Sequence, residues 1–528
     1  MISRRNFGKY SLGAGAATLW LPKSLAHAQD GVRPTLTIAV DNLWANINTI
    51  NGISTTTRRF FPNIYSHLVE RDYIADEQGL ALVPGLATEW SREGKVWTLK
   101  LREGVKFHNG ETMTAEDVAF TLGPERLWGE SPFEPRGKTF TAGFVRVEAI
   151  DDLTVEIETE REDPYIPGKL TGYIGFVVPK AAYLEMGVDA FGQAPIGTGP
   201  YRVTLFRSGE VLEMEAFDDH WGGPPPAEKL IWRIVPEFAG RMAGLVSGEF
   251  DFIANIPTDQ EAQLASYDNV TVARALAGNY PAFAFNTRPD PEDNPLVDVN
   301  LRKAMVQAID MDAIVQALFG ETTFHPAVPF NFPEYGDFYD PDMVNPLPYD
   351  PEAARALVEA SGYDGQVLRW HITRQFYPNY EAAAEIMVEQ WRQIGVNVQA
   401  VILDNFELVY TRPYHLMNMS MSTDFIPGDP YQPLWLDWGP TASRSTAHWK
   451  TWDPTPEYLA AGKEFEEAVE FEDRKAAYLK LSQAWQDVTP GYYLWKSVYN
   501  WAHRADIDFV PRPDGEMRMF GDYMALPA

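Results

Sequence analysis

The chain has 528 residues, with 74 acidic against 44 basic side chains and a formal net charge of −30. Such a charge repels phosphate backbones and anionic lipids, so it argues against nucleic-acid binding. The chain contains no cysteine, which excludes disulfides, thiolate metal sites, a cysteine nucleophile and a lipid-anchored cysteine. About 500 residues exceed what one hydrophobic core usually serves, so we expect at least two domains.

Residues 1–28 are typical of a twin-arginine signal peptide. Paired arginines, Arg4-Arg5, precede an apolar stretch of about twelve residues from Tyr10 to Leu21. A membrane span needs about 20 residues, and Ala26-His27-Ala28 is a small-x-small cleavage pattern. No later stretch is long and apolar enough to span a membrane. We therefore expect a free periplasmic protein that begins near Gln29 and carries no lipid anchor.

Strand patterns follow this segment. Val96–Arg102 alternates, with Trp97, Leu99 and Leu101 on one face, as a half-buried strand does. Further strands are predicted at Leu36–Val40, Leu153–Thr159, Lys229–Val235, Val270–Ala273 and Ala282–Phe285.

Helices are expected where capping residues precede an apolar periodicity. Thr114-Ala115-Glu116-Asp117 is a capping-box pattern. The stretch from Asp298 to Ile309 is predicted to be helical, and Asp310 to cap a second helix that ends at Gly320.

Residues 350–403 predict parallel strands joined by helices, and hence an α/β fold. Asp350-Pro351 begins a helix that Gly362 ends. The pattern continues with a strand (Val367–Ile372), a helix (Glu381–Ile394) and a strand (Asn397–Leu403). The next stretch, from Tyr410 to Pro440, is rich in proline, glycine and aromatic residues. It is predicted to be an irregular binding loop.

Motifs for catalysis are missing from the sequence. There is no Gly-x-Ser-x-Gly and no His-Glu-x-x-His, and the histidines lack ligand spacing. Gly197-Thr198-Gly199-Pro200 is interpreted as a turn, and His108 as a hydrogen-bonded structural histidine. Because 74 acids are present, the carboxylate pair of a glycoside hydrolase remains an alternative.

Several segments together resemble a known family. The runs Pro84 to Trp90, Leu101 to Gly110 and Thr114 to Val118 are similar to the signature of the peptide/opine/nickel class of ABC transporter solute-binding proteins. This class is the dipeptide/oligopeptide-binding family, or family 5. Further matches are Pro195 to Tyr201, Gly248 to Asp251, Phe285 to Thr287 and Val299 to Asp310. The resemblance covers nearly the whole chain after the signal segment.

The resemblance implies a two-lobed periplasmic binding protein fold with an additional subdomain on lobe I and two hinge crossovers. Lobe I would comprise residues 32–60, 180–282 and 498–528, the extra subdomain 61–179, and lobe II 283–497. The hinges would lie near Phe283–Asn286 and Ser497–Trp501. A ligand would be enclosed between the lobes.

The resemblance also implies ligand residues in lobe II. In dipeptide-binding members an arginine four residues before a proline pairs with the ligand carboxylate, and Arg374 and Pro378 keep that spacing. Tyr377 lies in the same segment and is included in the predicted site. The alternative for Arg374 is a surface ion pair.

This sequence lacks an aspartate at the position that binds the ligand's amino group in the family. Members carry this acid shortly before an Asp-Pro pair, but here Ile426 stands at that position before Asp429-Pro430. Asp424 is the nearest candidate, with a capping or loop aspartate as the alternative. This departure argues against a plain dipeptide ligand.

Aromatic and polar residues near these segments complete the predicted site. Tyr431, Trp435 and Trp438 could stack on a ligand, and Asn42 and Trp44 follow the first strand, where family members usually contact the ligand. The alternative for the aromatic residues is core packing.

The resemblance implies a non-catalytic, cofactor-free monomer. It would bind a small carboxylated solute, such as a peptide, an opine or a related amino-acid derivative, and deliver it to the membrane permease of an ABC importer. Binding of a metal chelate or an oligosaccharide by the same fold is an alternative. An exported glycoside hydrolase and a folding helper that holds unfolded chains are others.

Overall fold

The computed structural model of this chain describes residues 33–43, 46–50, 55–129, 137, 140–290, 293–374, 376–423 and 426–527. The predicted signal segment and the candidate residues Trp44 and Asp424 lie outside these ranges. Within the described ranges, no helix combines the length and apolar character that a membrane crossing requires.

A seven-stranded sheet is built around β1 (Thr35–Val40), which runs parallel to β10 (Lys229–Ile234) and β11 (Phe252–Ala254) on either side. Antiparallel strands extend both edges: β9 (Val211–Ala216) and β8 (Tyr201–Arg207) beyond β10, and β18 (Val498–Arg504) and β12 (Val270–Leu276) beyond β11. Ile38 and Val40 face one core and Ala39 the opposite one, as strand alternation requires.

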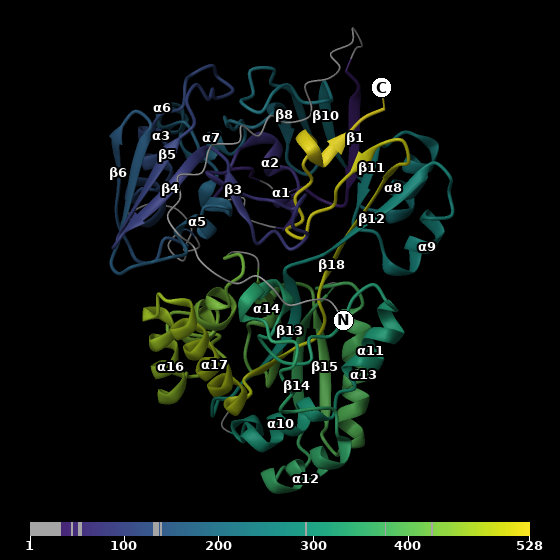
Figure 1. Cartoon of the computed structure of the whole chain (residues 1–528). Helices are drawn as coiled ribbons and strands as arrows, with labels where there is room; N and C mark the ends of the chain where they lie inside the picture. The colour runs from purple at the N-terminus through teal and green to yellow at the C-terminus, as the bar shows by residue number, and fades with distance from the viewer. Residues whose placement is uncertain are drawn as a thin grey trace, which may run out of the picture. The chain divides into compact units, whose positions relative to one another are not determined.

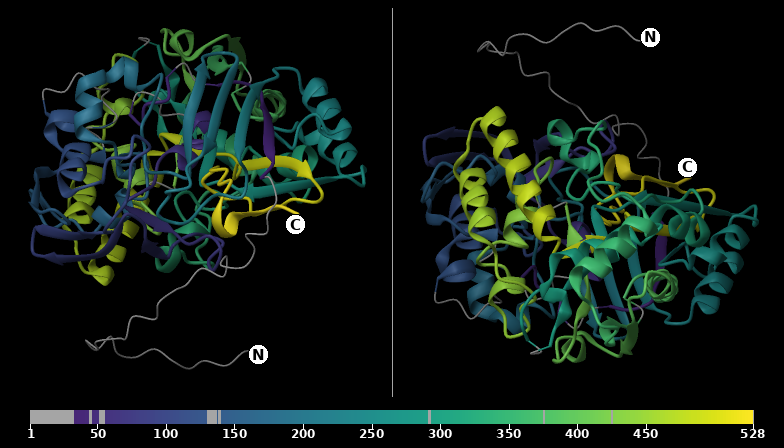
Figure 2. Two further views of the ribbon diagram at one scale, coloured as in Figure 1. Left: turned by 90° about the horizontal axis from the view of Figure 1, so that it is seen from above. Right: turned by 90° about the horizontal axis from the view of Figure 1, so that it is seen from below.

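Several short helices and C-terminal strands belong to the same half of the molecule as this sheet (Figures 1 and 2). They are α1 (Thr55–Arg58), α2 (Phe61–Ile64), α6 (Lys180–Met186), α7 (Val188–Phe191), α8 (Phe238–Ser247), η3 (Thr258–Gln260), α9 (Glu261–Leu264), β19 (Asp508–Phe509), η7 (Gly521–Tyr523) and β20 (Met524–Ala525).

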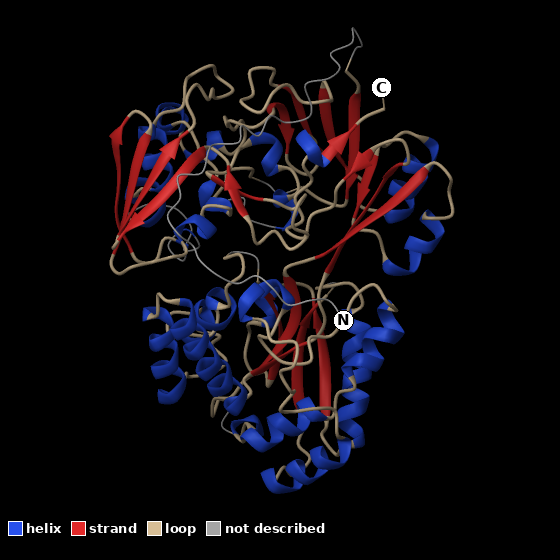
Figure 3. Cartoon of the chain, in the orientation of Figure 1, coloured by secondary structure: helices blue, strands red, loops and turns tan. Residues whose placement is uncertain are grey.

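A separate four-stranded antiparallel sheet includes part of the signature run from Pro84 to Trp90. Its order is β4 (Ala87–Glu93), β5 (Val96–Leu101), β7 (Thr154–Thr159) and β6 (Phe144–Asp151), and the sheet is drawn in red in Figure 3. Nearby elements are β2 (Val69–Arg71), β3 (Leu82–Pro84), α3 (Ala115–Leu122), η1 (Pro124–Trp128), α5 (Ile166–Lys169) and η2 (Tyr173–Gly175). The predicted capping box of Thr114 and Asp117 is confirmed at the start of α3.

His108 links the run from Leu101 to Gly110 to the turn within Pro195 to Tyr201, and the predicted structural role is confirmed. Its Nδ1 accepts the Gly197 amide at 3.2 Å, so in the neutral ring Nε2 carries the proton and donates to the Gly199 carbonyl at 3.0 Å. Burial lowers the pKa of His108 to about 4. A Cβ on Gly197 would lie 2.1 Å from the Ile64 carbonyl oxygen, so this turn requires glycine for close packing.

A five-stranded sheet has the order β15 (Val398–Leu403), β14 (Leu368–Thr373), β16 (Leu416–Ser422), β13 (Asn279–Phe285) and β17 (Gly491–Tyr493). Strands β15, β14 and β16 are parallel, whereas β13 is antiparallel to both β16 and β17. The predicted succession of helix, strand, helix and strand is confirmed by α12 (Pro351–Ser361), β14, α13 (Tyr380–Gln393) and β15.

Each face of this sheet has its own core. Phe283 and Phe285 of β13 point into one core, and Ala282 and Ala284 into the other. The first core is covered by α12, α13, η4 (Pro295–Val297), α10 (Val299–Gln307) and α11 (Met311–Phe319). The second is covered by η5 (Pro333–Phe338), η6 (Gln432–Leu436), α16 (Pro456–Glu467) and α17 (Phe471–Val488), with α14 (Phe406–Val409) and α15 (Ser443–Thr446) nearby.

The prediction that residues 410–440 are irregular throughout is wrong, because β16 lies inside this stretch and is a central strand. Its sequence alternates methionine with Asn418, Ser420 and Ser422, which are weak strand formers. Asn418 is nevertheless fully buried, and its Oδ1 accepts the Thr373 amide at 2.8 Å. Pairing with β13 and β14 therefore overrides the local preference.

The chain passes between the seven-stranded and five-stranded sheets twice. The first passage is Ala277-Gly278, between β12 and β13, and the second is residues 494–497, between β17 and β18. The two passages hydrogen-bond to each other, from the Ala277 amide to the Ser497 carbonyl and from the Ser497 amide to the Asn279 carbonyl, each at 2.8 Å. The first passage precedes the predicted hinge at Phe283–Asn286, because β13 begins earlier than its apolar residues indicate.

Candidate ligand-binding site

Ligands of open α/β sheets bind outside the carboxyl ends of the parallel strands. In the seven-stranded sheet β1, β10 and β11 end at the same edge, where Asp41, Val235 and Asn255 follow them. In the five-stranded sheet β14, β15 and β16 end at one edge, where Arg374, Asp404 and Thr423 follow. These two edges are the candidate site.

The first edge has a fixed polar cluster beside Asn42. Asn255 donates through Nδ2 to both carboxylate oxygens of Asp41 at 2.9 Å, and Arg59 donates to the Asn255 side-chain oxygen at 2.6 Å. Asn255 has a φ of 56°, a left-handed conformation that asparagine tolerates better than most residues. Asn42 itself is exposed and accepts a hydrogen bond from Thr56 at 2.9 Å. Sequence reasoning missed Asp41, Arg59 and Asn255, although strand ends could have indicated the first and third.

Arg374 lies at the second edge, where β14 ends. Its amide donates to the Leu403 carbonyl at 2.7 Å, which fixes the backbone at the strand end. Its guanidinium pairs with Asp404 at 3.1 Å, and the two side chains are 54% and 79% exposed. The alternative of a surface ion pair therefore describes Arg374 in this structure. Such an exposed pair contributes about 0–1 kcal/mol and can be exchanged at little cost.

Tyr377 belongs to the same edge as Arg374. It is half-buried, and its hydroxyl donates to the side-chain oxygen of Asn279, the first residue of β13. The aromatic ring packs edge-on against Phe376. The hydroxyl of Tyr377 is thus held by the strand next to β16.

A buried network of hydrogen bonds and an ion pair lies at this edge and was not predicted from the sequence. Glu334 accepts hydrogen bonds from Tyr280 at 2.9 Å and Thr423 at 2.8 Å, and it forms an ion pair with Lys496 at 2.9 Å. Both charged side chains are only 10% exposed. Thr423 directly precedes the candidate Asp424 in the sequence. These residues are far apart in sequence and belong to no motif, so no local signal could have found them.

Tyr431 is in contact with the segment that follows β7. Its ring stacks on Tyr165 with 5.9 Å between centroids and 8° between planes. Its hydroxyl donates to Glu466 at 2.8 Å and accepts from Arg161 at 3.2 Å. Burial raises the pKa of Tyr431 well above the ordinary value for tyrosine.

Trp435 and Trp438 are placed in the core between the five-stranded sheet and α16 and α17. Trp438 has no exposed surface, and its indole nitrogen donates to the Tyr493 hydroxyl at 2.8 Å. Trp435 packs against Gly462, where an added Cβ would come within 1.8 Å of the ring. The structure therefore favours the core-packing alternative for both tryptophans.

A buried ion pair adjoins Tyr431. Arg474 and Asp429 form two hydrogen bonds of 2.9 Å, with side chains only 3% and 5% exposed. The guanidinium also lies 4.2 Å from the centre of the Tyr165 ring and 3.9 Å from that of Phe465. Asp429, which sequence reasoning used only to locate the missing acid, is thus bound within the protein.

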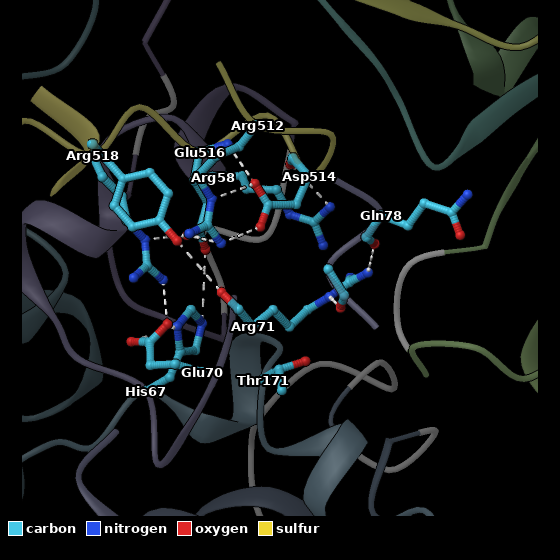
Figure 4. A network of polar contacts seen from close by, with 12 residues as sticks. Arg58, His67, Glu70, Arg71, Gln78, Thr171, Arg512, Asp514, Glu516 and Arg518 are labelled. Atoms are coloured by element: carbon cyan, nitrogen blue, oxygen red, sulfur yellow. Dashed lines mark hydrogen bonds and ion pairs between the residues drawn. The ribbon is translucent and has the colours of Figure 1, made fainter. Parts of the chain in front are cut away.

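A charged cluster joins the C-terminal segment to β2 (Figure 4). Arg512 pairs with Asp514 at 2.5 Å and Glu516 at 3.1 Å, and Arg518 pairs with Glu516 at 3.0 Å and with Glu70. The adjacent cavity, which His67 and Arg71 help to line, measures about 10 Å³. That is room for about one water molecule, so this cluster is structural.

No group of three or more metal-binding side chains occurs in the part of the chain that the structure describes. The candidate site thus consists of an acidic and amide-rich edge at β1 and β11 and an edge with an exposed arginine at β14. Such groups can bind a small polar molecule.

Comparison with known proteins gives the family context. Residues 81–443 match the family described as "Bacterial extracellular solute-binding proteins, family 5 Middle". The glutathione-binding protein GsiB of Pectobacterium atrosepticum is 26% identical over 75% of this chain and 73% of its own length. The dipeptide-binding protein of Escherichia coli is 25% identical over 64% of this chain, and the match spans just under two thirds of that protein, 66%.

Solved structures share the fold. The dipeptide-binding protein from Pseudoalteromonas sp. SM9913, in complex with Met-Leu, has a TM-score of 0.78 at 22% identity and covers 93% of this chain and 100% of its own. NikZ from Campylobacter jejuni, in complex with Ni(L-His), has a TM-score of 0.73 at 20% identity and covers 90% and 95%. The predicted fold, a mixed α/β two-lobed periplasmic binding protein, is therefore confirmed.

Proposed function

Because this chain belongs to the bacterial extracellular solute-binding proteins of family 5, we propose that it captures a small carboxylated solute for an ABC importer. The solute would be a peptide, an opine or a related amino-acid derivative. It would bind between the β14 edge and the β1 edge and be delivered to the membrane permease.

One observation carries the proposal: Arg374 presents a largely exposed guanidinium at the carboxyl end of a central parallel strand. A planar guanidinium binds a carboxylate through two parallel hydrogen bonds. Its partner Asp404 is exposed and becomes fully hydrated on release, so a ligand carboxylate can replace it. Tyr377 is close in sequence and would contact the same end of the ligand.

The opposite end of the ligand would meet groups of different chemistry. Asn42 offers an exposed amide, and Asp41 beside it carries a carboxylate. Asp424 is a further candidate for a cationic group, and Trp44 for an apolar contact. The family's amine-binding position holds Ile426, which is buried, so we favour a ligand whose amine is modified over a plain dipeptide.

The proposal includes export. Residues 1–28 would direct the chain through the twin-arginine route, and the protein would act as a free periplasmic monomer. It would have no catalytic step.

A thermal-shift screen tests this function. The panel holds di- and tripeptides, opines, betaines, oligosaccharides and nickel chelates, each at a large excess. A ligand at 100 times its dissociation constant stabilises the folded state by about 2.7 kcal/mol, a readily measured shift. A shift with one carboxylated class supports the proposal. A shift only with oligosaccharides or nickel chelates, or release of reducing sugar from a polysaccharide, would overturn it.

A further inference from the structure

The five-stranded sheet has a pocket at the edge opposite to Arg374. It is lined by residues from the amino ends of the three parallel strands and measures about 390 Å³. This volume lies within the range of about 300–1,000 Å³ that is typical of small-molecule sites. The lining residues are Asp293, Gln366, Val367, Arg369, Gln399, Pro413 and His415. Along β14, Arg369 and Arg374 are five residues apart, or roughly 17 Å in an extended strand.

Strand register brings the polar residues together. Arg369 of β14 pairs with Gln399 of β15, so the two side chains project from the same face of the sheet. His415 immediately precedes β16. Its amide donates to the Arg369 carbonyl at 2.9 Å, and its ring Nδ1 accepts the Arg369 amide at 3.0 Å. His415 is therefore locked to the strand that carries Arg369.

The hydrogen bond from the Arg369 amide to Nδ1 determines which ring nitrogen of His415 carries the proton. Because Nδ1 accepts an amide proton, the proton of the neutral ring is on Nε2. Nε2 makes no hydrogen bond with any residue in the described ranges, although the side chain is only 9% exposed. Burial, with Arg369 and His371 nearby, lowers the pKa of His415 to about 4, so the ring is neutral near pH 7. An imidazole N–H donor without a protein partner is thus present on a residue that lines the pocket.

Arg369 is the second donor. It is exposed, and its guanidinium forms no ion pair or hydrogen bond with the described part of the chain. This is notable in a chain where 74 acids compete for 44 bases. By contrast, Arg412, which precedes Pro413, is paired with Asp290 at 3.0 Å. An unpaired guanidinium next to a fixed imidazole N–H forms a donor pair suited to an anion.

The other lining groups define the rest of the ligand. Val367 and Pro413 supply apolar surface, and Val367 is 46% exposed. Asp293 is the only acid in the lining. Its backbone carbonyl accepts a hydrogen bond from the Gln366 side-chain amide at 2.6 Å, so the side-chain oxygen of Gln366 is left as an acceptor. The carboxylate of Asp293 is a further acceptor in the lining. These two acceptors favour an anion that also carries a hydroxyl group.

We propose that this pocket binds a small anion through one carboxylate or phosphate group, held by the guanidinium of Arg369 and Nε2–H of His415. The site is separate from the solute site at the carboxyl ends of the strands, and it would be occupied whether or not the solute is bound. Hydroxylated carboxylates and phosphate share this chemistry, and the experiment distinguishes them.

The test is a titration of purified protein, labelled at histidine, with inorganic phosphate and separately with malate, at constant ionic strength set with sodium chloride. The readout is the His415 ring signal in NMR spectra, assigned with His415→Asn, which keeps an acceptor for the Arg369 amide. We expect a saturable shift with phosphate, malate or both. The ligand that produces it identifies the anion class.

Three variants determine whether the shift comes from the pocket. Arg369→Gln should weaken binding about tenfold or more, because it removes a charge-assisted contact. Arg369→Lys should bind with intermediate affinity, since it keeps the charge but not the planar fork. Arg392→Gln is the control, because Arg392 forms an exposed ion pair with Glu389 and does not line the pocket, and it should bind like wild type. No shift beyond that of chloride, or equal affinity in Arg369→Gln, would overturn the proposal.

Discussion

Two arginine–aspartate pairs of the same chemistry differ in almost every other respect. Arg474 and Asp429 are buried, joined by two hydrogen bonds, and surrounded by Tyr165, Tyr431 and Phe465. Arg374 and Asp404 are exposed and joined by one contact of 3.1 Å at a sheet edge. The first pair has no access to a ligand, whereas either member of the second can leave its partner for one.

The difference shows that a residue type does not define a role. A buried pair is costly to break, because the remaining charge is left without solvent or partner. An exposed pair is hydrated on both sides and contributes little to folding. We therefore assign Arg474 to the stability of the fold and propose Arg374 for ligand binding. The predictions below test this division, starting from the largest expected effect.

Replacing Arg474 should cause the largest loss of stability. Arg474→Met leaves the Asp429 carboxylate buried without its partner, and we expect the free energy of unfolding to fall by about 3–5 kcal/mol. Urea unfolding of the ligand-free protein measures this. The matched control is Arg392→Met, because Arg392 forms an exposed pair with Glu389 and should lose at most about 1 kcal/mol. Equal losses in the two variants would remove the distinction between the pairs.

Glu70 should give the charged cluster of Figure 4 a pH-dependent contribution to stability. Burial opposes its ionisation, but Arg518 and His67 outweigh burial and lower the pKa of Glu70 from 4.5 to about 2. A lowered folded-state pKa stabilises the protein above the unfolded value, and this stability is lost as pH falls towards 2. The contribution is about 3 kcal/mol at pH 7 and about half of that at pH 3.

The measurement compares wild type with Glu70→Gln by urea unfolding at pH 7, 5 and 3. The difference in the free energy of unfolding between wild type and Glu70→Gln should shrink as the pH falls below 4.5. Glu385→Gln, at an exposed position of α13, is the control and should follow wild type across this range. A difference that stays constant from pH 7 to pH 3 would show that Glu70 is not held ionised by its neighbours.

Removing Arg374 should have the smallest effect on stability. Arg374→Gln breaks only the exposed contact with Asp404, so the free energy of unfolding should change by less than about 1 kcal/mol. Urea unfolding without added ligand measures it. A loss as large as that of Arg474→Met would mean that Arg374 serves the fold, and the binding proposal would lose its main support.

Elements with local determinants could be predicted from the sequence. Asp350 accepts the amides of Glu352 and Ala353 and begins α12, and Gly362 ends it with a φ of 69°. The alternating apolar residues of Val96–Leu101 form β5. In these cases the residues that determine the element lie within or directly beside it, so a pattern in the sequence is sufficient.

Features with distant determinants could not be predicted in the same way. β16 exists because β13 and β14 pair with it, although its own sequence has weak strand preference. The aromatic loop residue Trp438 is buried because Trp452, Trp485 and Tyr493 surround it. Lys496 reaches Glu334 only after the five-stranded sheet is assembled. The sequence alone identified Arg374 as a site candidate through family resemblance, and its binding role stays a prediction.

The most direct test of the account is the affinity of a carboxylated ligand from the thermal-shift screen, measured by calorimetry in two forms, with its free carboxylate and with a carboxamide in its place. Wild type and Arg374→Gln are each titrated with both. We predict that either change weakens binding about tenfold or more, and that the second change adds little once the first is made. If Arg374→Gln binds the free carboxylate as tightly as wild type does, the assignment of Arg374 to the ligand carboxylate is wrong.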